Sequence, residues 1–279
     1  MPRLTVPEIV AHKAKGKRIV SLTAYDAPMA RLAEQAGVDV ILVGDSLGMT
    51  VLGMQTTLEV TMDDMVHHCK AVIRGSERAH VVLDMPFMSY QTGEDDAVRN
   101  AGRALKEGGS QSVKIEGGAR LAPLAARLVD AGVPVMGHVG LQPQSVNRTG
   151  GFTTQGKDAA SADAVIDDAV SMAQAGVYAI VLEKIPLELA QHITSKVPVP
   201  TIGIGSGPHC DGQVLVVHDA LGFTEGFHPK HARQYLSFAT TARVALGEYV
   251  ADVREGRFPD DTHAVHATAE LQAHLRAKR

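Results

Sequence analysis

The chain has little cysteine, no excess of positive charge and no long hydrophobic run, and each absence excludes a class of protein. Its two cysteines, Cys69 and Cys210, form no CxxC pair, so a disulfide framework is not expected and a reducing compartment fits. The formal net charge of -4 argues against a partner bound through nucleic-acid phosphates. No apolar stretch approaches membrane-spanning length, and residues 1–5 carry no apolar signal-peptide core. We therefore expect a cytoplasmic protein with no nucleic-acid and no membrane partner.

Zinc is not expected either, because the thirteen histidines include no HExxH motif and no convincing Cys/His spacing. The rest of the composition is ordinary for a globular protein, with 45% hydrophobic and 21% charged residues. A chain of 279 residues can bury a large core, either as one domain of barrel size or as two domains.

Short apolar runs alternate with helical stretches from Arg18 to about Gly222, which is typical of βα units in a parallel sheet. The expected strands are Ile19–Tyr25, Val38–Gly44, His80–Asp84, Ser112–Glu116, Val133–His138, Tyr178–Glu183, Pro200–Gly205 and Val214–His218. Eight strands fit a TIM barrel better than a flavodoxin-like sheet, which normally has about five or six. We predict an α/β fold, a TIM (β/α)8 barrel.

Glycine stands just past the end of most expected helices, where a left-handed C-cap residue is common. These helices are Ala27–Gln35, Asp63–Arg74, Glu94–Lys106, Leu121–Ala131 and Ala160–Ala175. The triplet Ala-Gly-Val at 36–38, 131–133 and 175–177 repeats one helix-to-strand junction three times.

The C-terminal region lies beyond the eighth expected strand. His231–Arg254 is predicted to form one long helix, an accessory segment that packs on a neighbouring subunit. The stretch 260–279 is polar and Ala-rich and need not be ordered. We expect one barrel domain at 1–259, including the C-terminal helix, followed by a polar tail at 260–279.

Carboxylates end several of the expected strands, and a histidine ends another. In a TIM barrel the carboxyl ends of the strands form the active-site face, so these side chains should ring one mouth. Each acid alone could simply cap the next helix, but their equivalent positions favour a common site. Two or three carboxylates there suit a hard divalent cation such as Mg²⁺. The residues are Asp45, Asp84, Glu116, His138 and Glu183.

Lys114 and Glu116 lie on the same face of one expected strand, because side chains alternate along a strand. They could form a buried ion pair and nothing more. They could also serve a site in which Lys114 meets an anionic substrate group and Glu116 helps to hold the metal; pairing would keep Lys114 charged. A Schiff base at Lys114 is a third option, which nearby carboxylates and metal disfavour.

A glycine-rich stretch, Gly203–Pro208, follows the seventh expected strand, where barrels often bind phosphate. It matches neither a Walker nor a Rossmann motif, so a plain tight turn is the preferred interpretation.

At these residues the sequence resembles the ketopantoate hydroxymethyltransferase family, in blocks spread in order from about Leu4 to Pro259. The matching blocks are Leu22–Asp26, VGDSLGMTVLG at 43–53, Asp84–Phe87, VKIEGG at 113–118, GHVGLQPQSVNR at 137–148, VLEKIP at 181–186 and GIGSGPHCDGQVLVVHDALG at 203–222. The resemblance implies a TIM barrel that transfers a hydroxymethyl group from 5,10-methylenetetrahydrofolate to 3-methyl-2-oxobutanoate in pantothenate synthesis. It also implies a large homo-oligomer, a decamer.

The resemblance further implies one Mg²⁺ per subunit and 5,10-methylenetetrahydrofolate as co-substrate. Asp45 and Asp84 would bind the metal, and Glu116 would complete its shell directly or through water. The keto acid would contact Ser46 and Lys114 together with the two metal-binding aspartates. Glu183 would be the catalytic base.

The chain departs from the family pattern at Ser206, at His209 and in a loop around Thr149 and 152–154 that is normally more basic. None of these positions belongs to the expected catalytic set. The changed loop leaves open which residues hold the tail of the folate.

Two rival functions are compatible with an acid-lined barrel. One is a metal-dependent barrel of the phosphoenolpyruvate mutase or isocitrate lyase type, although its lyases need a group such as a cysteine in a mobile loop. Cys69 lies within an expected helix and Cys210 in a turn, so neither fits. The other is a metabolite-binding barrel without catalysis, which has no use for an isolated strand-end acid such as Glu183.

Overall fold

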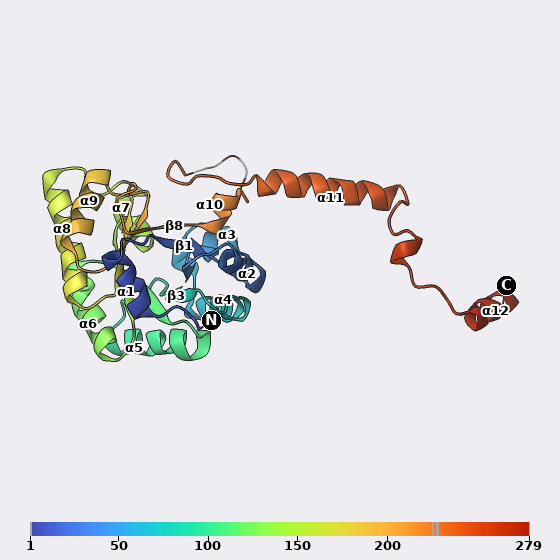
Figure 1. Cartoon of the computed structure of the whole chain (residues 1–279), viewed down its shortest axis with the longest axis horizontal. Coiled ribbons are helices and arrows are strands. Elements are labelled where there is room, and N and C mark those ends of the chain that lie inside the picture. The colour runs from blue at the N-terminus through green and yellow to red at the C-terminus, as the bar shows by residue number, and fades with distance from the viewer. Residues whose placement is uncertain (1, 225, 227–228, 279) are drawn as a thin grey trace.

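Eight parallel strands close into a barrel in the order β1 to β8, with β8 pairing back onto β1 (Figure 1). The computed structural model describes residues 2–224, 226 and 229–278. The strands are β1 (Ile19–Thr23), β2 (Val40–Val43), β3 (His80–Asp84), β4 (Ser112–Glu116), β5 (Val135–Gly140), β6 (Ala179–Glu183), β7 (Thr201–Ile204) and β8 (Gly212–Leu215). The predicted TIM barrel is confirmed.

Helices lie between the strands and surround the barrel, except for the last ones of the chain, which extend away from it (Figure 1). They are α1 (Val6–Ala14), α2 (Ala27–Gln35), α3 (Leu47–Thr50), η1 (Thr57–Glu59), α4 (Met62–Gly75), α5 (Glu94–Arg103) continued by η2 (Ala104–Gly108), η3 (Ala119–Leu121), α6 (Ala122–Asp130), η4 (Pro143–Ser145), α7 (Val146–Thr149), α8 (Ala159–Gln174), α9 (Leu187–Lys196), α10 (Val217–Leu221), α11 (Phe238–Arg254), η5 (Asp261–His263) and α12 (Ala269–Ala277).

The repeated Ala-Gly-Val junction has a local cause. Gly37, Gly132 and Gly176 follow α2, α6 and α8 with φ of 93°, 85° and 88°. Only glycine adopts such angles without strain, so each helix stops there and the chain turns into the next strand.

The strands bury two separate apolar layers because their side chains alternate between the two faces. One layer fills the barrel interior and includes Val40, Val82 and Val181. The other lies between strands and helices and includes Ile41, Leu83 and Val113. Lys114 and Glu116 alternate with Val113 and Ile115, so their strand directs both polar side chains into the barrel.

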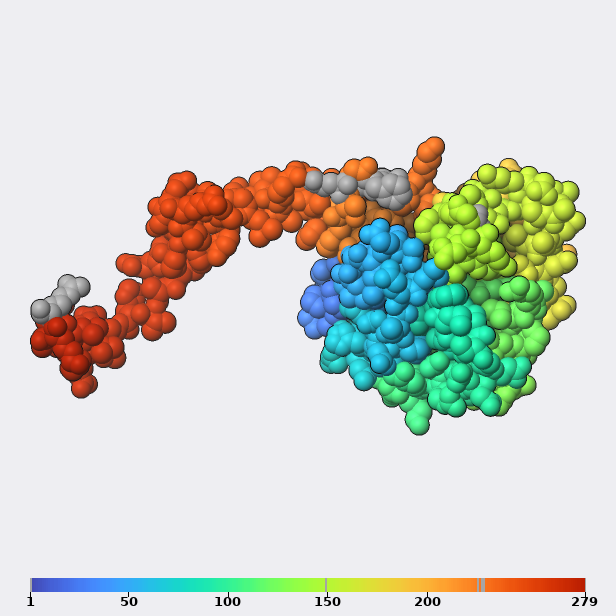
Figure 2. All heavy atoms as spheres, turned by 180° about the vertical axis from the view of Figure 1, so that it is seen from behind, coloured from blue at the N-terminus to red at the C-terminus, as the bar shows by residue number. Residues whose placement is uncertain are grey.

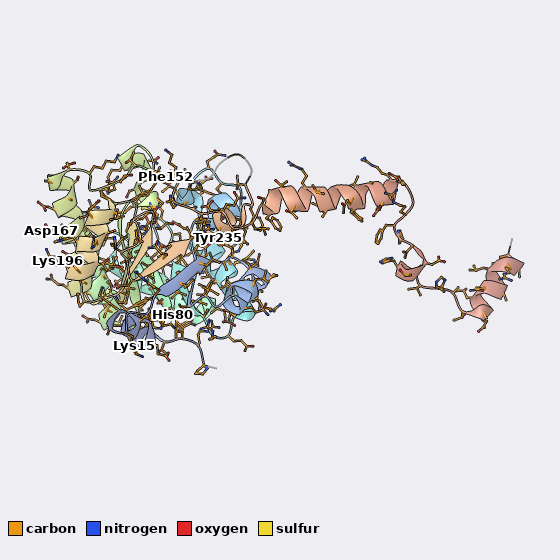
Figure 3. The ribbon with its side chains drawn as sticks, turned by 45° about the horizontal axis from the view of Figure 1, so that its top comes forward. Lys15, His80, Phe152, Asp167, Lys196 and Tyr235 are labelled. Atoms are coloured by element: carbon orange, nitrogen blue, oxygen red, sulfur yellow. The ribbon has the colours of Figure 1, made fainter. Side chains whose placement is uncertain are left out.

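A hydrogen-bonded cluster of buried polar side chains closes the N-terminal end of the barrel. His80 Nε2 lies 2.9 Å from Ser112 Oγ, and that oxygen lies 2.9 Å from the Tyr178 hydroxyl. His80 Nδ1 lies 3.0 Å from the carbonyl oxygen of Leu4, which leads into α1. Figure 3 shows His80 at the opposite end of the barrel from Phe152. The cluster holds the N-terminal segment against the barrel floor.

Acidification should weaken the fold through His80. Burial lowers the pKa of its imidazole to about 4, below the usual value of about 6.5. The native state therefore binds fewer protons than the unfolded state between these values, so the stabilisation is complete above pH 6.5 and is lost as pH falls toward 4. From pH 7 to pH 5 this group should remove about 2 kcal/mol from the free energy of unfolding. Urea unfolding at both pH values should show a smaller loss in His80→Gln; equal losses would contradict the prediction.

Two predicted elements need correction. The eighth strand is Gly212–Leu215 rather than Val214–His218, and His218 lies in α10. The long C-terminal helix begins at Phe238 rather than at His231. The residues just before it are not helical, and Tyr235 N–H donates to the carbonyl of Ala220 in α10 instead of continuing a helix. Sequence periodicity does not register such a tertiary contact.

From α11 to α12 the chain forms an arm that projects from the barrel (Figures 1 and 2). No residue of α11 or α12 is buried within the chain. Large apolar side chains are nevertheless exposed on α11, among them Leu246 (63%) and Tyr249 (55%). The predicted division at residue 259 stays a prediction. In the part of the chain that the structure describes, no helix is both long and apolar enough to cross a membrane.

Candidate active site

Strand register brings the polar strand-end residues side by side at the C-terminal end of the barrel. Asp84 on β3 pairs with Lys114 on β4, and Glu116 pairs with His138 on β5. Glu183 ends β6, opposite Gly140 of β5. The parallel arrangement thus turns positions that are far apart in sequence into neighbours at one mouth.

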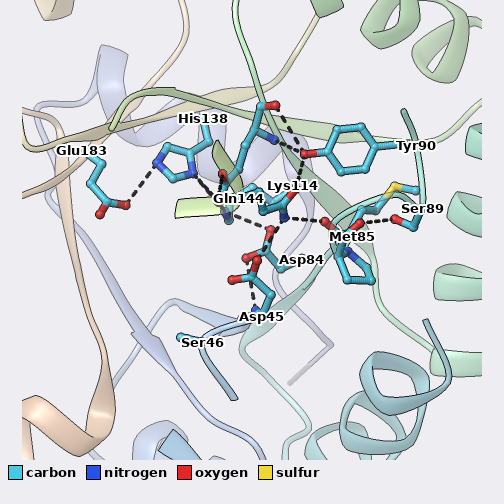
Figure 4. Close-up of polar contacts among 12 residues, drawn as sticks. Asp45, Ser46, Asp84, Met85, Ser89, Tyr90, Lys114, His138, Gln144 and Glu183 are labelled. Carbon is cyan, nitrogen blue, oxygen red and sulfur yellow. Dashed lines mark hydrogen bonds and ion pairs between the residues drawn. The ribbon is translucent and has the colours of Figure 1, made fainter. Parts of the chain in front are cut away.

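Lys114 is the cation of this cluster. Its Nζ lies 2.9 Å from Asp84 Oδ1 and 3.9 Å from Glu116 Oε1 (Figure 4). The side chain is 4% exposed, so water does little to screen these charges. Burial lowers the pKa of Lys114, but Asp84 and Glu116 outweigh it and raise the pKa above its usual value. A charged Lys114 cannot act as a Schiff-base nucleophile at neutral pH.

The aspartates carry more negative charge than Lys114 offsets. Burial, followed by repulsion from Asp84 and then Glu116, raises the pKa of Asp45 well above its usual range. Burial also raises the pKa of Asp84, although Lys114 acts against it. The pKa of Glu116 is lowered instead, because His138 and Lys114 outweigh the cost of burial. A further positive charge beside Asp45 and Asp84 would therefore be stabilising.

His138 connects this cluster to Glu183. Its Nε2 lies 3.1 Å from Glu183 Oε2, and its Nδ1 lies 3.1 Å from Lys114 Nζ. Burial and Lys114 lower the pKa of His138, but Glu116 and Glu183 raise it further, to about 9 on balance. The contact with Lys114 is a hydrogen bond only while Nδ1 is unprotonated, because an ammonium group can only donate. At neutral pH the raised pKa keeps the ring protonated, so His138 and Glu183 form a close ion pair.

Gln144 is a member of the site that sequence patterns did not single out. Its Nε2 donates to Asp45 Oδ2 at 3.0 Å, and its backbone N–H donates to Glu116 Oε2 at 3.0 Å. The Tyr90 hydroxyl donates to Gln144 Oε1 at 2.7 Å (Figure 4). Gln144 lies in η4, on a loop without periodicity, so its only sequence signal was its place in a family block.

Ser46 follows Asp45, and its Oγ lies 2.9 Å from the Tyr25 hydroxyl. The glycine-rich stretch after β7 is a tight turn, with Gly205 and Gly207 at φ of 65° and 76°. Within it, Ser206 Oγ donates to the carbonyl of Leu182 on β6 at 2.8 Å. The turn therefore braces the strand that carries Glu183.

A cavity of about 520 Å³ opens over these side chains. Asp45, Asp84 and Lys114 line its base, and Phe152 and His231 line it from the loops. Its volume is within the usual range for small-molecule sites. All six residues with a predicted catalytic, metal or substrate role line it, namely Asp45, Ser46, Asp84, Lys114, Glu116 and Glu183.

The side chains fit a hard divalent cation held by two aspartates. Asp84 Oδ1 is buried and accepts no hydrogen bond from another described residue, although Lys114 Nζ lies 2.9 Å away. The backbone N–H of Asp45 lies 3.3 Å from Asp84 Oδ2, so the two aspartates are neighbours. Within the described residues, no group of three or more His, Cys, Asp or Glu is arranged to hold a metal ion. Mg²⁺ needs fewer protein ligands, because it keeps several waters.

Comparison with known sequences covers nearly the whole chain. The model of the ketopantoate hydroxymethyltransferase family matches residues 3–261. A 3-methyl-2-oxobutanoate hydroxymethyltransferase of Carboxydothermus hydrogenoformans is 53% identical over 271 residues, which are 97% of this chain and 98% of that protein. The protein of the same name from Moorella thermoacetica is 53% identical over 262 residues, 94% of this chain and 97% of its own.

Comparison with solved structures shows the fold. A phosphonopyruvate hydrolase in complex with oxalate and Mg²⁺ is similar with a TM-score of 0.62 at 13% identity, over 99% of this chain and 97% of its own. A phosphoenolpyruvate phosphomutase from Streptomyces platensis subsp. rosaceus has a TM-score of 0.63 at 14% identity, over 99% and 97%. At identities this low, the similarity shows only that the proteins share the barrel fold.

Proposed function

Because the chain belongs to the ketopantoate hydroxymethyltransferase family, we propose that it transfers a hydroxymethyl group from 5,10-methylenetetrahydrofolate to 3-methyl-2-oxobutanoate. The product is 2-dehydropantoate (ketopantoate), a step of pantothenate synthesis. The observation that carries this proposal is the line of contacts from Asp84 through Lys114 and His138 to Glu183 at one barrel mouth. It supports the proposal because enolisation of a keto acid needs a cation for the substrate and a carboxylate for proton removal, and Lys114 and Glu183 lie at one mouth with His138 between them.

Substrate binding follows from charge. Lys114 would offset the carboxylate of the keto acid, and Ser46 would donate a hydrogen bond to it. Asp45 and Asp84 would hold one Mg²⁺, with Glu116 reaching it through water because its own oxygens meet Gln144 and His138. When bound, the metal would supply Lewis-acid stabilisation of negative charge on the keto oxygen, which makes the C3–H acidic.

Proton transfer is assigned to Glu183. Glu183 lines the cavity, and its Oε2 lies 3.1 Å from His138 Nε2. Glu183 would remove the C3 proton, and the resulting carbanion would attack the one-carbon unit. The bond between that carbon and the folate nitrogen would break, one water would supply the hydroxyl oxygen, and tetrahydrofolate would leave. Lys114 stays protonated and takes no part in the proton transfer.

The structure bears on both rivals. The similar solved structures include members of the phosphoenolpyruvate mutase and isocitrate lyase superfamily, so the fold does not separate them from this chain. Cys69 and Cys210 are both buried, and burial raises the pKa of the Cys69 thiol to about 12, so neither can act as an exposed loop acid. A binding barrel would not need the His138–Glu183 pair. These observations favour the transferase.

The decisive assay combines the purified protein with both substrates and Mg²⁺. Ketopantoate detected by mass spectrometry, at a rate that rises with protein concentration, is the expected result. Turnover of phosphonopyruvate or 2-methylisocitrate without ketopantoate formation would favour the rival barrel. Binding of the keto acid without any turnover would favour the metabolite-binding protein.

The proposed metal site predicts a loss of Mg²⁺ affinity in Asp45→Asn and Asp84→Asn. Mutation of residues that hydrogen-bond to metal ligands typically lowers metal affinity about 10–100-fold, so loss of a ligand itself should lower it at least that much. Because burial, and then repulsion from Asp84 and Glu116, raises the pKa of Asp45, Asp45→Asn should not lower the stability of the metal-free protein. Calorimetric titration with Mg²⁺ measures the affinity, and Asp130→Asn at the exposed end of α6 is the control. Unchanged affinity in both variants would refute the site.

We also propose a cytoplasmic homo-oligomer, a decamer by family resemblance. Two buried free thiols suit a reducing compartment. The exposed apolar side chains of α11, such as Val244 and Leu246, are of the kind that subunit interfaces cover. Sedimentation at micromolar concentration should show one large species. Leu246→Asp together with Val244→Asp should reduce its mass, and a wild-type monomer would contradict the proposal.

A further inference from the structure

A second cavity lies beside the candidate active site. It measures about 350 Å³ and is formed by the loops that follow β3, β4 and β5. Glu116 lines both cavities, and Gln144 lines this one while bonding to Asp45 of the other. Tyr90, which also lines the second cavity, donates a hydrogen bond to Gln144 Oε1 and holds Gln144 between the two cavities. We call it the β3–β5 pocket.

Two arginines of this pocket have no charged or hydrogen-bonding partner among the described residues. Arg120 and Arg148 line it and are exposed. Among the residues that the structure describes, neither guanidinium has an ion-pair or hydrogen-bond partner. Guanidinium groups match the planar, two-oxygen geometry of a carboxylate.

The two acids of the pocket do not neutralise these arginines. Glu116 accepts the backbone N–H of Gln144, and its other oxygen lies 3.6 Å from His138 Nδ1 on the barrel side. Asp168 Oδ1 accepts the backbone N–H of Ala119 at 2.8 Å. The positive charge therefore remains available to a ligand.

We propose that the β3–β5 pocket binds the amide-linked glutamate tail of the one-carbon donor, with Arg120 and Arg148 on its carboxylates. This inference rests on the proposed function. The pocket opens on the same face of the barrel as the main cavity, since all its loops follow strand ends. Gln142 also lines it, and a side-chain amide matches the peptide-like bond of such a tail. The one-carbon end of the donor would then lie over Lys114 in the main cavity. Its anionic end would lie in the β3–β5 pocket, on the other side of Gln144.

The test compares Arg120→Gln, Arg148→Gln and the double variant with wild type, using mono- and polyglutamylated 5,10-methylenetetrahydrofolate. Loss of one charge-assisted hydrogen bond at a partly exposed site corresponds to about a tenfold rise in KM for the donor per arginine. If the polyglutamylated donor has a lower KM than the monoglutamylated donor in wild type, this difference should disappear in the double variant, while kcat changes little. Arg31→Gln on α2, also an exposed arginine, is the matched control and should behave as wild type.

Donor-free deuterium exchange at C3 of the keto acid separates this inference from the proposed function. Normal exchange with an unchanged donor KM in the double variant would overturn the tail site alone. Absence of both exchange and product in the wild type would overturn the proposed function. Citrate is the free polycarboxylate probe: inhibition competitive with the donor and weakened in the double variant supports the tail site. Noncompetitive inhibition that the double variant abolishes would show an effector site and overturn the assignment.

Discussion

Glu183→Gln is expected to slow exchange of the C3 proton of 3-methyl-2-oxobutanoate for deuterium by about 10²–10⁴-fold, the usual contribution of a positioned base. Wild-type protein with Mg²⁺ should exchange this proton even without folate, because deprotonation precedes transfer. Glutamine has the shape of glutamate and can still accept from His138 Nε2, 3.1 Å away in the wild type. The variant should therefore keep its fold and its affinity for the keto acid while losing the proposed base. Proton NMR in D₂O follows the exchange directly.

Glu188→Gln is the matched control for this experiment. Glu188 lies in the first turn of α9, in the same βα unit as Glu183, but it is exposed to solvent. The Glu188→Gln variant should exchange the C3 proton at the wild-type rate. If Glu183→Gln does so as well, the base lies elsewhere, and His138 at the neighbouring strand end is then the first candidate.

Lys114→Met is expected to lower the free energy of unfolding by about 3–5 kcal/mol, the usual cost of removing one partner of a buried ion pair. Methionine fills similar space, so the loss comes from charge. Asp84 and Glu116, which are 3% and 2% exposed, would be left without their buried cation. The variant should also bind the keto acid too weakly to detect. Urea unfolding followed by circular dichroism measures the stability.

Two further variants separate charge from packing at this position. Lys106→Met makes the same change at an exposed position just before β4, and it should stay within about 0.5 kcal/mol of wild type. Lys114→Met combined with Asp84→Asn removes both partners of the closest pair and should recover part of the lost stability. Wild-type stability in Lys114→Met alone would show that Lys114 is not required to neutralise the buried acids.

The barrel itself could be predicted because its signals are local. The apolar run Val40–Val43 and the alternating pattern of Ser112–Glu116 are typical of strands, and glycines with positive φ, such as Gly37 and Gly176, mark where helices end. The start of α11 at Phe238 could not be predicted in this way. The residues before it have a helical sequence pattern, but the backbone N–H of Tyr235 donates to the carbonyl of Ala220 in α10.

The fold alone would have left the function undecided. Barrels of the phosphoenolpyruvate mutase and isocitrate lyase superfamily are similar over nearly the whole chain at 14% identity. It is the ordered series of sequence blocks, from the Asp45 region to the one that holds Glu183, that places the chain in its family. Shape is shared among these enzymes because many sequences satisfy one packing arrangement, whereas a site requires particular side chains.

The sequence by itself determined the strand-end positions of Asp45, Asp84, Glu116 and Glu183, because alternation and strand length depend on neighbouring residues. Only the tertiary structure decided how these groups meet. Closure of the barrel sets Lys114 2.9 Å from Asp84 and His138 3.1 Å from Glu183, and it brings Gln144 from a loop onto Asp45. Distances between residues on different strands depend on register and burial, which are properties of the whole packed chain, so no local pattern could encode them.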